Sequence, residues 1–142
     1  MRVKISVELT DTVEEIRKSI KHQMESRAYR VANEIRNSTL DVLRGQRSGR
    51  RYRVPGTKAY YTASAPGEPP AVRTGAFRLS WQPEALIEDG KYTSSVKTNQ
   101  KRLADWLENG TPGGKMAPRP YHDRILADVE PKSVRIYSEP YF

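Results

Sequence analysis

Residues 45–75 are the stretch that most limits how this 142-residue chain can fold. No helical or strand period runs through them, and they hold five of the nine glycines and four of the ten prolines. Loops of this length are uncommon inside compact domains and are usually functional or disordered. The sequence therefore predicts one domain, residues 1–142, with a long extended arm at 45–75. Part of the arm is a candidate hairpin, because strand-favouring tyrosines flank Pro55-Gly56.

The segment from Arg44 to Lys58, which leads into this arm and forms its first part, is strongly basic. It carries six cationic residues and no acidic one, with tyrosines between and after them: Arg44, Arg47, Arg50, Arg51, Arg53 and Lys58, beside Tyr52, Tyr60 and Tyr61. Guanidinium groups suit phosphate oxygens, and a flexible cationic arm binds nucleic-acid backbone without reading its sequence. Docking on an acidic surface of a neighbouring subunit fits the same charges equally well, and a merely solvated charge run is the third interpretation. The arm is thus predicted to face DNA or a protein partner.

The first third of the chain predicts a strand and a long helix. Residues 3–9 alternate apolar and polar side chains, which indicates a strand. Asp11, with Glu14 three residues later, is typical of a helix start. The helix is expected over 12–43, at roughly 45 Å, with a weak point at 37–39. Its apolar stripe is Ile16, Ile20, Met24, Ala28, Val31 and Ile35.

The rest of the chain predicts short elements. The strongest signal is Asp89-Gly90, which is typical of a tight hairpin turn. Asn99 is expected to cap the first of two short helices, and Pro131 to end the second. The expected strands are 76–81, 85–88, 91–98 and 133–137, and the expected short helices are 100–110 and 121–129. The fold class is α+β, with a small, mostly antiparallel sheet, one long amphipathic N-terminal helix and two short helices.

Two tryptophans could lie in the core or at an interface. The apolar spacing around Trp106 favours the core, whereas that around Trp81 leaves both positions open.

Composition limits the classes of partner. The chain is 36% hydrophobic and 30% charged, with a net charge of +8, so an anionic partner is expected. It has no cysteine and no apolar run of membrane-spanning length, which fits synthesis in the cytoplasm and no membrane partner.

The residues do not predict an enzyme. His22 and His122 are far apart, and no metal-ligand spacing surrounds them. Gly110 to Lys115 lacks the spacing of a phosphate loop, and no serine lies in a Gly-x-Ser-x-Gly motif. No cofactor or metal is expected.

An ordered set of motifs resembles one protein family. The segments are Ala63-Ser-Ala-Pro-Gly-Glu-Pro-Pro-Ala71, Thr74-Gly-Ala-Phe-Arg-Leu-Ser80, Leu103-Ala-Asp-Trp-Leu-Glu-Asn-Gly-Thr111 and Met116-Ala-Pro-Arg-Pro-Tyr121. They resemble the neck and tail-completion (head–tail joining, minor tail component) proteins of long-tailed bacteriophages and prophages. Leu103 replaces the family's usual tyrosine, and Phe77 its usual leucine.

The resemblance implies a structural virion protein at the head–tail junction. It would be made in the bacterial cytoplasm and would form a homo-oligomeric ring around the DNA channel. Its partners would be head-closure or connector proteins, tail-terminator or tail-tube proteins, and the DNA that passes through. A tail terminator, a head-closure ring protein, or a sequence-nonspecific nucleic-acid-binding module are the alternatives.

The family motif positions are expected to define the fold. They are Pro66, Gly67, Thr74, Gly75, Glu108, Gly110, Thr111, Arg119 and Pro120. Thr74-Gly75 would be a tight entry into a strand, Glu108 to Thr111 a sharp helix end, and Arg119 would hold a rigid turn by pairing with a carboxylate. Deletion of 46–62 is expected to leave a folded domain.

Overall fold

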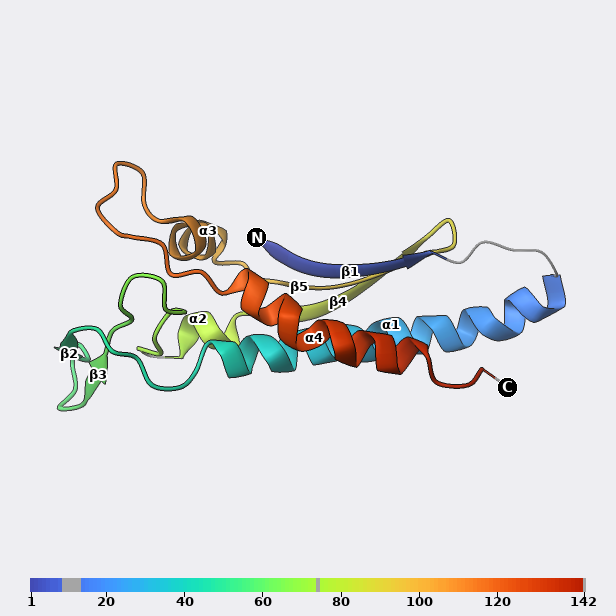
Figure 1. The fold of residues 1–142 in the computed structure, drawn as a ribbon, viewed down its shortest axis with the longest axis horizontal. Helices are drawn as coiled ribbons and strands as arrows, with labels where there is room; N and C mark the ends of the chain where they lie inside the picture. The colour runs from blue at the N-terminus through green and yellow to red at the C-terminus, as the bar shows by residue number, and fades with distance from the viewer. Residues whose placement is uncertain (9–13, 74, 142) are drawn as a thin grey trace.

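The structure is a computed structural model that describes residues 1–8, 14–73 and 75–141. It is elongated, with a sheet and two helices along its length and loops and a small hairpin at one end (Figure 1). The elements are β1 (Arg2–Glu8), α1 (Glu14–Val42), β2 (Arg51–Arg53), β3 (Tyr60–Thr62), α2 (Ala76–Leu79), β4 (Gln82–Glu88), β5 (Lys91–Lys97), α3 (Lys101–Asn109) and α4 (His122–Tyr137). The α+β class is confirmed.

A three-stranded antiparallel sheet forms the middle of the molecule, in the order β1-β5-β4. Asp89 and Gly90 join β4 to β5 with positive φ angles of 47° and 77°. Both angles suit the primed turn that matches the twist of paired strands, so the predicted hairpin is confirmed. Val3, Tyr92 and Val96 are buried against the helices.

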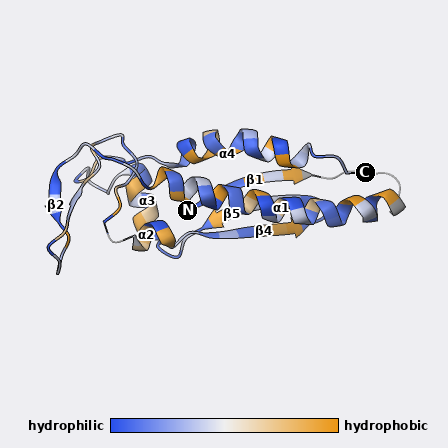
Figure 2. Ribbon diagram, turned by 90° about the horizontal axis from the view of Figure 1, so that it is seen from below, coloured by the Kyte–Doolittle hydropathy of each residue, from blue (hydrophilic) through white to orange (hydrophobic). Residues whose placement is uncertain are grey.

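The long helix α1 packs along one face of this sheet (Figure 2). Its apolar stripe is buried from Met24 to Ile35, but Ile16 is exposed on turns that extend past the sheet. The predicted weak point at 37–39 is wrong, because the helix continues through it. There the Ser38 hydroxyl donates to Asp128 of α4, and the Thr39 hydroxyl donates to the Ile35 carbonyl, 2.7 Å away. The predicted cap at Asp11 lies outside the described residues.

Three aromatic rings close the core at the other end of α1. Trp81 and Tyr121 are fully buried and pack edge-to-face with Phe77, with ring centroids 5.8–6.1 Å apart. The predicted strand at 76–81 is wrong. Residues 76–79 form a helical turn, which places Phe77 and Trp81 on one side and leaves Leu79 exposed.

The last two helices differ from prediction in length and capping. Helix α3 forms as expected, but Gln100 is its N-cap, not Asn99. Trp106 is only half-buried, with the Arg102 guanidinium 5.8 Å from its ring centre. Helix α4 continues through Pro131 to Tyr137, so the predicted strand at 133–137 is wrong. A proline costs the helix one hydrogen bond, and the packing of Ile125, Val129 and the residues after Pro131 compensates for it.

The structure does not show the extended arm expected at 45–75. Strands β2 and β3 form a short antiparallel hairpin at the end of the molecule. The hairpin base is closed by backbone hydrogen bonds from Gly49 to Ala63 (2.9 Å) and from Ala63 to Arg50 (2.8 Å). Turns held by side chains occupy the rest of the segment, because its glycines and prolines build tight turns.

Candidate functional site at the basic end

The charge of the protein is concentrated at the hairpin end. Residues 41–81 and 99–124 carry 13 lysines and arginines against five acidic residues, which equals the net charge of +8 of the whole chain. These residues make up the end of α1, the β2–β3 hairpin, α2, α3 and the loops between them (Figure 1). We call this region the basic end. A region with this net charge attracts anionic partners.

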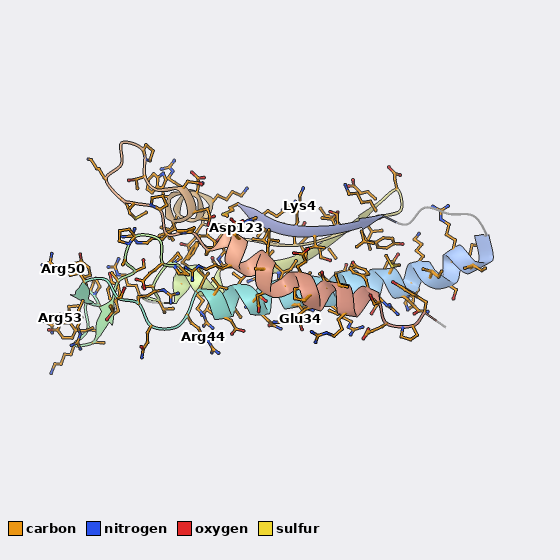
Figure 3. The ribbon with its side chains drawn as sticks, in the orientation of Figure 1. Lys4, Glu34, Arg44, Arg50, Arg53 and Asp123 are labelled. Atoms are coloured by element: carbon orange, nitrogen blue, oxygen red, sulfur yellow. The ribbon has the colours of Figure 1, made fainter. Side chains whose placement is uncertain are left out.

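The β2–β3 hairpin is the most exposed part of the basic end. Arg51, Tyr52 and Arg53 are all exposed, and Arg50 and Arg53 point away from the body (Figure 3). Guanidinium groups lie over tyrosine rings, Arg51 over Tyr60 at 4.8 Å and Arg50 over Tyr52 at 5.5 Å. Such contacts hold the charges in place while leaving their N–H groups available to a ligand.

The tip of the hairpin is a turn built from Val54 to Ala59. The Arg53 guanidinium donates to the Thr57 carbonyl (2.8 Å), and the Thr57 hydroxyl donates to the Val54 carbonyl (2.9 Å). Lys58 is exposed beside them. Four of the six predicted arm cations, Arg50, Arg51, Arg53 and Lys58, therefore lie together on one exposed hairpin.

The other two predicted arm cations have different roles. The Arg47 guanidinium turns inward and donates to the carbonyls of Pro69 (2.7 Å), Val42 (2.9 Å) and Pro70 (3.2 Å). Burial lowers the pKa of Arg47. Arg47 thus ties the hairpin base to the end of α1, whereas Arg44 is exposed and pairs with Asp41 at 3.4 Å.

A proline-glycine turn at 65–68 holds the other side of the hairpin base. Pro66 and Gly67 occupy its centre, and Gly67 has φ 86°, which favours glycine. The Glu68 carboxylate accepts from the backbone N–H groups of Ala65 (2.6 Å) and Ser48 (3.1 Å). These hydrogen bonds lower the pKa of the Glu68 carboxyl. Glu68 lies in the first motif segment, but no local signal predicted its role in holding this turn.

The motif around Glu108 forms a sharp helix end, as predicted. Gly110 has φ 85°, and an added Cβ would lie 2.8 Å from the Met116 carbonyl oxygen, so this position requires glycine. The Thr111 hydroxyl accepts from the Met116 N–H at 2.9 Å. The Glu108 carboxylate accepts from the N–H groups of Tyr121 (2.8 Å) and His122 (3.1 Å), and so caps the start of α4.

Arg119 joins this helix end to the 65–68 turn. Its guanidinium donates to Ser64 (3.0 Å to the hydroxyl) and to the Ala117 carbonyl (2.8 Å). The expected pairing with a carboxylate is therefore wrong. The Gly67 N–H donates to the Pro118 carbonyl at 3.2 Å, and Pro120 fixes the backbone that leads into α4. We call residues 64–68, 107–111 and 116–122 the motif cluster, since three separate motif segments meet there.

The Thr74-Gly75 pair differs from expectation. Thr74 lies outside the described residues. Gly75, with φ 86°, precedes the helical turn α2 and not a strand.

Replacing Glu108 with alanine should loosen the start of α4. Two backbone N–H groups would lose their acceptor, and the negative charge at the helix N-terminus would be lost. We expect a loss of about 1 kcal/mol in the free energy of unfolding, measured by urea denaturation. Glu108→Gln keeps an acceptor oxygen and should lose less. Equal stability of Glu108→Ala and the unchanged protein would contradict the capping role.

An apolar groove opens next to the hairpin base. It has a volume of about 490 Å³ and lies between the 63–73 loop, α2 and α3. Leu43, Phe77, Leu103 and Leu107 line it, with Arg78 and Arg119 among them. The basic end therefore combines charge with apolar surface, which suits a protein partner as well as a phosphate backbone.

The described residues show no group that could hold a metal. No three or more His, Asp or Glu side chains gather within residues 1–8, 14–73 and 75–141. The Nδ1 atom of His122 lies 3.5 Å from a carboxylate oxygen of Asp123, whose side chain is fully exposed.

Comparison with known proteins does not assign the chain to a family. No protein-family model matches the chain, and it matches no curated protein and no solved structure. The resemblance therefore depends on the quoted motifs. Within the described part of the chain, no helix is long and apolar enough to cross a membrane.

Proposed function

We propose that this protein is a structural component of the head–tail junction of a long-tailed bacteriophage or prophage, a neck or tail-completion protein. In this role it forms part of a ring around the DNA channel and joins the head to the tail. Its neighbours are head-closure or connector proteins on one side and tail-terminator or tail-tube proteins on the other. The basic end meets an anionic partner there, either the DNA or an acidic protein surface.

The observation that carries the proposal is the motif cluster. The hydrogen-bonded residues of the motif segments are up to 55 positions apart in sequence, yet their side chains and backbones bind one another directly. Residues that define a fold are expected to meet in this way. The motif cluster also anchors the base of the basic hairpin, through Ser64 and Glu68.

Labelling of purified particles tests this proposal. Antibodies raised against the protein and coupled to gold should mark the junction between head and tail in electron micrographs. Label confined to the capsid surface or the tail tip, or protein absent from purified particles, would contradict it.

A sequence-nonspecific nucleic-acid-binding module is the second candidate, and the concentration of charge at the basic end favours it. In that case the isolated protein binds duplex DNA of any sequence with micromolar or tighter affinity and with a steep salt dependence. Changing Arg50, Arg51, Arg53 and Lys58 to glutamine should reduce the salt slope by about 3 to 4, if each contacts one phosphate. Arg44→Gln is a matched control outside the hairpin. No binding at low salt would remove this candidate.

A further inference from the structure

The helical layer extends beyond the sheet at β1. Helix α1 packs beneath β4 and β5, whereas α4 packs beside α1 and contacts β1. Figure 2 shows α4 alongside β1, not beneath the middle of the sheet. A cleft of about 570 Å³ lies there, lined by Ile5 and Val7 of β1 and by Leu126, Val134 and Tyr137 of α4. Val134 is 60% exposed. The apolar side of α4 thus continues the apolar layer past the edge of β1, where one more strand would pack.

Both outer strands of this sheet have free backbone groups. Pro83 has no N–H, so in β4 it must face away from β5. Peptide groups alternate in direction along a strand, so those of Ala85 and Ile87 also face outward. Val96 pairs with Pro83, so its own peptide groups face away from β4 and bind Val3 of β1. The next residues along β1 alternate in direction, so the peptide groups of Lys4 and Ser6 face outward from β1. Such edges are templates for pairing with another strand.

The two edges carry side chains of opposite charge. Within one copy the Glu84 carboxylate already pairs across the sheet with Arg2 (3.3 Å) and Lys97 (3.4 Å), so Lys4 and the exposed Glu88 are the charges that a contact between copies would add. On the face away from the helices, β1 bears Arg2 and Lys4, and Lys4 points away from α1 in Figure 3. The same face of β4 bears Glu84 and Glu88, while Ala85 and Ile87 face the helices. A β4 strand placed beside β1 would turn its apolar side chains into the cleft and its carboxylates toward the face that bears Lys4.

We propose that β4 of a second copy of this chain pairs with β1, in parallel, and that this contact repeats from copy to copy. Strands β1 and β4 run in the same direction, since both are antiparallel to β5. Repeating the same step therefore gives a head-to-tail contact that forms a ring if it closes. Pairing of β1 with β1 of another copy would bring Arg2 and Lys4 close to their own counterparts, which like charges disfavour.

The layers also set the direction of curvature. Three strands occupy about 14 Å across a sheet, because neighbouring strands are roughly 4.8 Å apart. Two packed helices occupy about 16–20 Å. An array of copies is therefore wider on the helical side and bends with the sheet on its inner surface. This inference deepens the proposed ring assembly and rests on it.

Two proline variants test the contact in solution. Ser6→Pro removes the outward N–H from β1, and Ala85→Pro removes it from β4, the edge strand that already contains Pro83. Sedimentation velocity should show that the unchanged protein self-associates as its concentration rises. Each variant alone should lose every species larger than the monomer. An equimolar mixture should form a dimer that grows no further, since one intact β1 and one intact β4 remain.

Other patterns would overturn the proposal. Association of Ala85→Pro by itself would indicate β1–β1 pairing, and association of Ser6→Pro by itself would indicate β4–β4 pairing. A mixture that stays monomeric, or an unchanged protein that stays monomeric up to its solubility limit, would exclude this contact. Circular dichroism checks that both variants fold. If either does not, Lys4→Glu, at an exposed position, should weaken association by roughly two- to fivefold at low salt, and no change would count against the contact. Loss of this contact with labelling still at the junction would leave the proposed function standing.

Discussion

A variant in which Asn-Gly replaces residues 51–62 should fold normally and fail to join heads to tails. The design follows the hairpin base, where the Ala63 N–H already donates to the Arg50 carbonyl across the hairpin, so a two-residue turn can close it. It keeps Arg47 and Ser48, which the deletion of 46–62 suggested by the sequence would remove. Since Arg47 binds three carbonyl groups of the body, that larger deletion would also damage the fold.

The measurement is complementation of a phage whose copy of the gene is disrupted. Plaque titre with the shortened protein should fall to the level of the disruption alone, while its unfolding transition stays near that of the unchanged protein. A second variant, with glutamine at Arg50, Arg51, Arg53 and Lys58, keeps the hairpin and removes its charge. Loss of titre in both variants assigns the effect to charge, and loss in the first alone assigns it to the hairpin backbone. A normal titre with the shortened protein would contradict a need for the hairpin.

Arg27→Ala should destabilise the protein more than any other single charge removal that we can identify in the described residues. Arg27 is 5% exposed, and its guanidinium donates to the carbonyls of Ile136, Tyr137, Glu139 and Pro140, at 2.5–3.2 Å. It also lies 3.7 Å from the centre of the Tyr141 ring. The Ile136 carbonyl also accepts from the Glu139 N–H, and the Tyr137 carbonyl also accepts from the Tyr141 hydroxyl. Removing Arg27 therefore mainly takes the donor from the Glu139 and Pro140 carbonyls, which follow α4. We expect a loss of about 3 kcal/mol or more in the free energy of unfolding.

Arg30 provides the matched control for this prediction. It lies one turn along α1 and pairs with the Glu139 carboxylate at the exposed surface. Because water screens exposed pairs, Arg30→Ala should cost much less than Arg27→Ala. Urea denaturation of both variants measures the difference. Similar losses for the two would show that Arg27 does not hold the end of α4.

The sequence predicted those parts of the fold that depend on neighbouring residues. The Asp89-Gly90 hairpin and the body of α1 are local patterns, and both are present. The basic cluster was found for the same reason. The different role of Arg47 within this cluster was not predicted, because its inward turn depends on carbonyl groups more than 20 residues away. The Arg27 contacts join residues more than 100 positions apart, and no local signal marks them.

The errors in secondary structure have a related cause. Phe77, Leu79 and Trp81 alternate like a strand, but packing with Tyr121 favours one helical turn that brings Phe77 and Trp81 together. Pro131 normally ends a helix, but the contacts of Arg27 with the end of α4 stabilise the turns beyond it. In both places tertiary contacts outweigh local preference.

Electron microscopy of lysates from a phage or prophage with this gene disrupted tests the proposed function most directly. We expect DNA-filled heads beside separate, finished tails, with joined particles restored when the intact gene is supplied. Intact, infectious particles in the absence of the gene would contradict a role in joining head to tail.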